Sequence, residues 1–170
     1  MKKTIAILLL VCLMPSFSFA DGFGLKVTEF IEYFNERSSD KPIEPITNGK
    51  VFGSGDTQYI RLKADDGVEI FLRYADTVDS ELSGIIIMQK ASSTDFEKLL
   101  SVATSATYVL SNNATDDIND AYYQHFQVIC EAVSYYGYSG KSISTYAKGY
   151  TVQYQIDDGT RKIYIAPVDN

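Results

Sequence analysis

The residue types best suited to chemistry, one histidine and one cysteine, lie close together in the segment YYQHFQVICEAVSYYGYSG, residues 122–140. A thiol and an imidazole can act as a nucleophile and its general base, and both can bind metals. The segment has the apolar spacing of a helix, in which each residue turns by about 100°, so that His125 and Cys130 point about 140° apart. Because a base must reach its nucleophile within hydrogen-bond distance, this spacing excludes a Cys130–His125 dyad. We interpret Cys130 as a small, partly buried side chain and predict no catalytic residue.

His125 lies on the apolar face of this predicted helix. The residues that share the face are Ile118, Tyr122, Ile129, Val133 and Tyr136. We therefore expect a buried imidazole with a hydrogen-bond partner, since polar groups in a protein core are nearly always bonded. A ligand-contacting position and a position at the rim of the core are the alternatives.

The sequence contains no other ligand set or motif for a metal or a cofactor. If Cys12 belongs to a leader, the remaining chain has one cysteine and one histidine, too few for a structural zinc site. P-loop, GxSxG, HExxH, EF-hand and GxGxxG patterns do not occur. Acidic pairs occur at residues 65–66, 116–117 and 157–158, where a turn or the start of a helix accounts for them. We predict no cofactor and no metal site.

Residues 1–20, MKKTIAILLLVCLMPSFSFA, have the layout of a cleavable signal peptide. Two lysines precede an apolar run of about ten residues, which is half of what a membrane span needs, and small residues precede the cleavage point. We expect export to the periplasm or the extracellular space, a mature chain that begins at Asp21, and no stable membrane anchor. Residues 21–170 are predicted to form a single domain, which has no internal disulfide because it has one cysteine.

The chain is acidic. Its formal net charge is −7, and removal of Lys2 and Lys3 with the leader makes it −9. Such a charge repels nucleic acid and anionic membranes, and it favours solubility and basic protein partners. We therefore expect a basic protein as the partner and exclude nucleic acid.

Tyrosine is concentrated in the C-terminal half, where ten of the 13 tyrosines fall between Tyr108 and Tyr164. Tyrosine is enriched in protein interfaces, and it also suits strands. We interpret Tyr150, Tyr154 and Tyr164 as residues of a sheet face, and residues 134–140 as a partly exposed loop. The candidate partner-binding residues are Tyr135, Tyr136, Tyr138, Tyr146, Asp157 and Asp158.

The elements that position these side chains follow from the hydrophobic periodicity. Helical spacing occurs in residues 27–36, 94–111 and 116–135, and the last of these helices is expected to end near Gly137 or Gly140. Period-two alternation occurs around two Asp-Asp-Gly steps, which are strong hairpin signals, in residues 59–64, 68–74, 150–156 and 162–165. The apolar run within residues 82–90 predicts a central strand, and the proline-containing residues 38–50 are typical of a loop. The order α-β-β-β-α-α-β-β predicts an α+β fold with an antiparallel sheet of about five strands and helices packed on one face.

Together these features predict a small exported binding protein and not an enzyme. We expect an inhibitor or immunity-type protein that binds and neutralises a secreted toxin or hydrolase, because an acidic, tyrosine-rich surface suits electrostatically steered protein binding. One alternative is an envelope carrier of a small apolar ligand or lipid, enclosed by the sheet and the helices. The other is a carboxylate-dependent hydrolase, because two carboxylates can be brought together in space without a signal in their sequence spacing.

Overall fold

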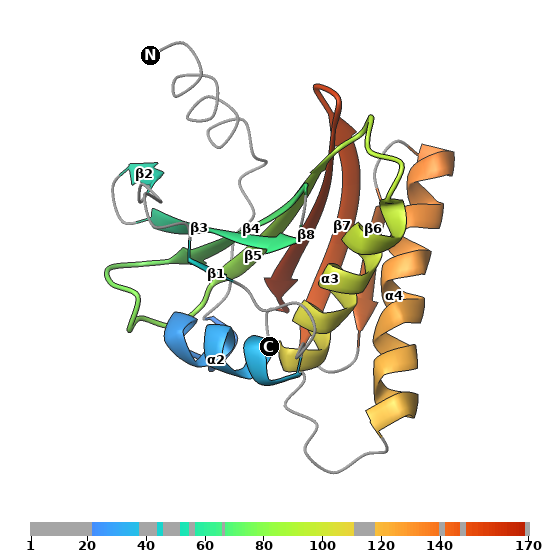
Figure 1. The fold of residues 1–170 in the computed structure, drawn as a ribbon. Coiled ribbons are helices and arrows are strands. Elements are labelled where there is room, and N and C mark those ends of the chain that lie inside the picture. Colours follow the sequence, from blue (N-terminus) through green and yellow to red (C-terminus); the bar gives the residue numbers. More distant parts are fainter. Residues whose placement is uncertain are drawn as a thin grey trace.

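The computed structural model describes residues 22–37, 44–45, 52–54, 57–65, 67–110, 118–139, 142–146 and 149–168. In these ranges the chain forms an α+β fold, with one antiparallel sheet and three helices packed on one of its faces, as predicted (Figure 1). The helices are α2 (Val27–Arg37), α3 (Phe96–Leu110) and α4 (Ile118–Ser139). The strands are β1 (Glu44–Pro45), β2 (Phe52–Ser54), β3 (Thr57–Asp65), β4 (Val68–Tyr74), β5 (Gly84–Lys90), β6 (Ser142–Tyr146), β7 (Tyr150–Asp157) and β8 (Thr160–Pro167).

The sheet has the strand order β1-β3-β4-β5-β8-β7-β6, and β2 also pairs with β3. The five predicted strands are β3, β4, β5, β8 and β7, which lie side by side. The prediction of a central strand is confirmed, because β5 joins the hairpin β3–β4 to the hairpin β7–β8. Ile85, Ile86 and Ile87 of β5 are all buried, as an apolar run in the middle of a sheet requires.

The alternation of apolar and polar residues decides which side chains meet the helices. Leu62 on β3 pairs with Ile70 on β4, and both are fully buried in the main core with Val27 and Phe30 of α2. The side chains between them, such as Arg61 and Glu69, alternate to the opposite face. This helix-free face has its own small cluster of buried side chains, Tyr59, Phe71, Ile86 and Tyr164.

The two Asp-Asp-Gly steps form different turns. In the second hairpin, Asp157 pairs with Thr160 in a regular register, and Asp158 and Gly159 both have positive φ, 46° and 67°. Two positive φ values are the signature of a type I′ turn. In the first hairpin, the register shifts between Lys63 and Asp65, and Gly67 has φ 83°. The same Asp-Asp-Gly sequence therefore occurs in two different turns, and the register shift is found in the first hairpin alone.

The strand β6 and the last part of α4 depart from the sequence prediction. β6 pairs with β7 at the edge of the sheet and was not predicted, because Ser-Ile-Ser-Thr-Tyr is too short and too polar to give a clear pattern. The helix α4 continues to Ser139, so the prediction of a helix end near Gly140 is confirmed, and the expectation of a partly exposed loop over residues 134–140 is wrong for residues 134–139. The tyrosines in this stretch have ordinary helix propensity, and the packing of α4 on β6 and β7 extends the helix over them.

The short strands β1 and β2 were also not predicted, since the two prolines in this region are typical of a loop. Pro45 lies at the edge of the sheet, opposite Leu62 of β3, which is where a strand tolerates proline. Both strands pair with β3, and they leave the five predicted strands in place.

The segment before α2 is held against the connection from β4 to β5. The amide of Phe23 donates to the carbonyl of Leu82, and the amide of Leu82 donates to the carbonyl of Leu25. Gly22 lies so close that a Cβ atom there would be 2.6 Å from the carbonyl oxygen of Leu82. The predicted leader, residues 1–20, and Asp21 lie outside the described residues.

Candidate functional site

His125 is buried and has a hydrogen-bond partner, as predicted. Its side chain is 0% exposed, and its Nδ1 atom forms a hydrogen bond with the hydroxyl of Tyr150. The imidazole stacks on the Tyr150 ring, with centroids 5.7 Å apart, and it makes a T-shaped contact with the Tyr108 ring, with centroids 5.9 Å apart. The three rings come from α4, β7 and α3, so His125 joins two helices to the sheet.

Cys130 is a half-buried free thiol on the same helix. Burial raises the pKa of this thiol, which lowers the fraction of reactive thiolate. His125 is held between Tyr150 and Tyr108, and Cys130 is five positions further along α4. The structure therefore places these two residues as the helix geometry predicts, with no shared site.

The six candidate partner-binding residues fall at two ends of the sheet. Asp157 and Asp158 form the turn between β7 and β8. Residues 135–138 lie in the last part of α4, which ends at Ser139. β6 follows directly, with Ser142 opposite Tyr154, so the end of α4 lies at the same end of the sheet as this turn (Figure 1). Tyr146 is at the other end of β6, opposite Tyr150. The side chains of Tyr135, Tyr136, Tyr138 and Tyr146 lie outside the described residues.

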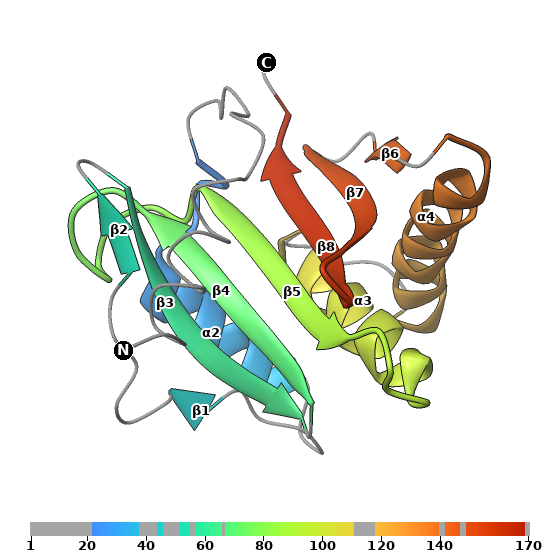
Figure 2. The ribbon, with the colours of Figure 1, turned by 90° about the horizontal axis from the view of Figure 1, so that it is seen from above.

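Charge is separated between the two faces of the sheet. In Figure 2 the helix-free face of the sheet is turned toward the viewer, with α2 and α3 behind it. Among the described strands, the alternation places five basic and three acidic residues on this face, Arg61, Lys63, Arg73, Lys90, Lys162, Glu44, Glu69 and Asp157. The helix layer is acidic by comparison, with Glu29, Glu32 and Glu36 on α2 and Glu131 on α4. The net charge of −7 thus conceals a basic sheet face.

Some of the polar side chains on this face are paired with one another. Lys162 is 1% exposed, and its ammonium group forms an ion pair with Asp157 at 2.8 Å. Beside it, the Gln155 amide donates to the hydroxyl of Tyr164 at 2.7 Å. Burial and the charge of Asp157 raise the pKa of Tyr164 to about 12, although the hydrogen bond from Gln155 lowers it. These side chains are bonded to one another within the sheet, so we assign them to the stability of the fold and not to a binding site.

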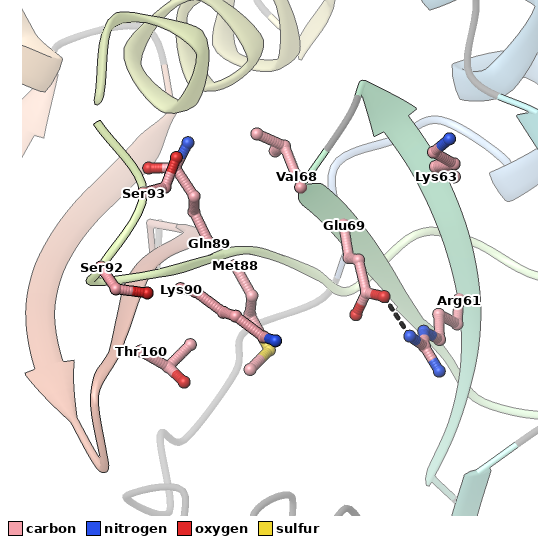
Figure 3. A pocket seen from close by; sticks show the side chains of 11 residues that line it. Arg61, Lys63, Val68, Glu69, Met88, Gln89, Lys90, Ser92, Ser93 and Thr160 are labelled. Atoms are coloured by element: carbon pink, nitrogen blue, oxygen red, sulfur yellow. Dashed lines mark hydrogen bonds and ion pairs between the residues drawn. The ribbon is translucent and has the colours of Figure 1, made fainter. Parts of the chain in front are cut away.

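A pocket of about 600 Å³ lies at one end of the sheet, which we call the hairpin end (Figure 3). The hairpin end is formed by the β3–β4 turn, the last residues of β5 with the segment after it, and the β7–β8 turn. The residues that line the pocket are Arg61, Lys63, Gly67, Val68, Glu69, Met88, Gln89, Lys90, Ser92, Ser93 and Thr160. This volume lies in the range of 300–1,000 Å³ that small-molecule sites occupy.

The register of the strands fixes how the pocket side chains lie. Lys63, Glu69 and Met88 are directly opposite one another on three successive strands, and Lys90 is opposite Thr160. Figure 3 shows Met88 and Lys90 between Thr160 on one side and the Arg61–Glu69 ion pair on the other. Lys63 and Lys90 therefore lie two strand spacings apart across the sheet, roughly 10 Å, and two residues apart along it, with Glu69 of β4 between them.

The sequence interpretation missed these pocket residues, although their signal is present. The alternation that predicted the first hairpin also places Arg61, Lys63 and Glu69 on one face. What the alternation cannot supply is the neighbour on that face, since Lys90 and Thr160 are brought there by the pairing of β5 with β4 and β8.

Within the described ranges, no group of three or more His, Cys, Asp or Glu residues is placed to hold a metal ion. None of the described helices is both long enough and apolar enough to span a membrane. Comparisons with models of known protein families, with curated proteins and with solved structures found no match.

Proposed function

We propose that this chain is an exported binding protein, of the inhibitor or immunity type, that holds a protein partner at the hairpin end of its sheet. The observation that supports the proposal is the pocket there, where three separate parts of the chain converge around charged and hydroxyl side chains. Asp157 and Asp158, two of the predicted partner-binding residues, belong to the same end. The signal-like residues 1–20 support export.

The pocket chemistry favours binding over catalysis. Its lining includes neither His125 nor Cys130, and its one carboxylate, Glu69, is paired with Arg61. General acid–base catalysis needs a group that can exchange a proton near the operating pH, and a nucleophile needs a base beside it. The charged lining also favours a polar ligand over the apolar ligand of the carrier hypothesis.

The test uses one obstructing substitution and a matched control. Ser92 is exposed in the pocket wall, and Thr77 is exposed in the connection from β4 to β5, at the opposite end of the sheet. The purified exported protein should capture a single stoichiometric partner from an envelope extract. Ser92→Trp should then weaken the affinity for that purified partner at least about tenfold, because it fills the pocket, and Thr77→Trp should leave the affinity within about twofold. Equal affinity of the two variants would contradict the proposed surface.

A further inference from the structure

We infer that the pocket at the hairpin end binds an anionic oxygen group, a carboxylate or a phosphate, and that Glu69 holds Arg61 until that group arrives. The inference rests on the proposed function in taking this pocket as the binding site, and it names the chemistry of what enters. Four of the lining residues carry a charge: Arg61, Lys63 and Lys90 are positive, and Glu69 is negative. The lining is therefore +2 in a chain whose net charge is −7.

Lys90 is the main anion-binding residue in this inference. It lies at the end of β5 with its side chain exposed, and within the described part of the chain it forms no ion pair. Thr160 is directly opposite on β8, and Ser92 is two residues further along the chain. Figure 3 shows the Lys90 side chain extending toward Met88, and Ser92 and Thr160 add two hydroxyl groups to the same lining. The ammonium group can donate charge-assisted hydrogen bonds to an anion, and the hydroxyl groups can donate neutral ones.

Arg61 and Glu69 form the opposite wall. The Arg61 Nη2 atom is paired with Glu69 Oε1, and the Arg61 Nε atom is buried without a hydrogen-bond partner in the described structure. A guanidinium group offers five donors, so one carboxylate leaves part of the fork unused. An anion that enters the pocket can bind the remaining donors of Arg61 or displace Glu69 from it. Glu69 therefore competes with the anion for Arg61.

Other ligand classes fit the lining less well. A cation would meet three positive charges and a single carboxylate that is already paired. An apolar ligand would leave the ammonium group of Lys90 without water or a partner, which is costly for a charge.

The experiment measures anion binding by the purified exported protein, with ionic strength held constant by chloride. The probes are inorganic phosphate, succinate and a short peptide of glutamates, followed by the amide NMR signals of Lys90, Ser92 and Thr160. Binding of phosphate or succinate alone indicates a small anion as the natural ligand, and binding of the peptide alone indicates an acidic segment of a protein. The wild type should bind at least one probe with saturable shifts at these positions.

Four substitutions are expected to weaken binding, to strengthen it or to leave it unchanged. Lys90→Gln should weaken binding about tenfold, because it removes a charge-assisted hydrogen bond. Glu69→Gln should strengthen binding about fivefold, because it removes the competing carboxylate and releases Arg61. Lys26→Gln makes the same charge change at the opposite end of the molecule, where the backbones of Lys26 and Glu81 form an isolated β-bridge. This control should leave the affinity unchanged. Thr160→Val, which keeps the side-chain shape, should weaken binding a few fold.

The inference is overturned if no probe binds at millimolar concentration, if Lys90→Gln and Lys26→Gln weaken binding equally, or if Glu69→Gln weakens binding. These outcomes are distinct from failure of the proposed function. If the wild type binds no anion but Ser92→Trp still weakens partner binding, the anion inference is wrong and the proposed partner surface stands. If the wild type binds an anion but Ser92→Trp does not change partner binding, the proposed function is wrong and the anion inference stands.

Discussion

The imidazole of His125 is enclosed by Tyr150 and Tyr108, and this contact gives the first prediction. His125→Ala removes the packing of α4 against both rings and leaves the Tyr150 hydroxyl without this partner. The free energy of unfolding in urea should fall by about 1–3 kcal/mol. Tyr150→Phe should show coupling with it of about 1 kcal/mol in a double-mutant cycle. A His125→Ala protein of unchanged stability that no longer binds its partner would instead place His125 in a site.

Tyr164 gives a prediction for alkaline pH. Its pKa is raised to about 12 in the folded chain from 10.0, so the unfolded chain loses the proton first. The stability that Tyr164 contributes is therefore present below pH 10 and is lost as the pH rises from 10 through 12. The loss is at most roughly 3 kcal/mol, and less where water screens the phenolate. Urea unfolding of Tyr164→Phe between these pH values should show a shallower decline than the wild type; parallel curves would contradict this assignment.

At the scale of elements, the β7–β8 turn makes the sharpest demand on the backbone. Gly159 has φ 67°, where a residue with a Cβ atom costs about 1–2 kcal/mol. Gly159→Ala should lower the free energy of unfolding by about that amount and the melting temperature by a few degrees, measured by circular dichroism. Gly159→Asn is the matched control, since asparagine tolerates the left-handed region, and it should lose less. An equal loss in both variants would point to the new side chain itself and not to the backbone.

At the scale of the whole molecule, the arrangement of charge alters the partner expected from the sequence. The total charge of −7 favours a basic partner, and this expectation stays a prediction for approach at long range. Within the Debye length of about 8 Å at physiological salt, a ligand responds to local groups, and at the hairpin end these are Arg61, Lys63 and Lys90. A partner protein with a basic surface and one acidic group that enters the pocket would complement both the total charge of the chain and the local charges at the hairpin end.

The sequence by itself determined the class of fold, the five main strands, the three helices and the burial of His125. Each of these depends on local periodicity or turn chemistry, such as the alternation from Leu62 to Ile70 around an Asp-Gly step. The glycines placed the end of α4 near Gly137 or Gly140 without choosing between them, and the helix, which packs on β6 and β7, ends at Ser139.

Only the tertiary structure decided the strand order, the edge strand β6 and the pocket. Lys90 and Thr160 are 70 positions apart in the sequence, and Lys63 and Lys90 belong to strands that are not neighbours. Alternation tells which face a side chain occupies, but pairing between distant strands selects its neighbours, and no local pattern encodes that pairing. The candidate site is for this reason a property of the assembled sheet, built from side chains whose own segments indicate nothing more than a solvated strand face.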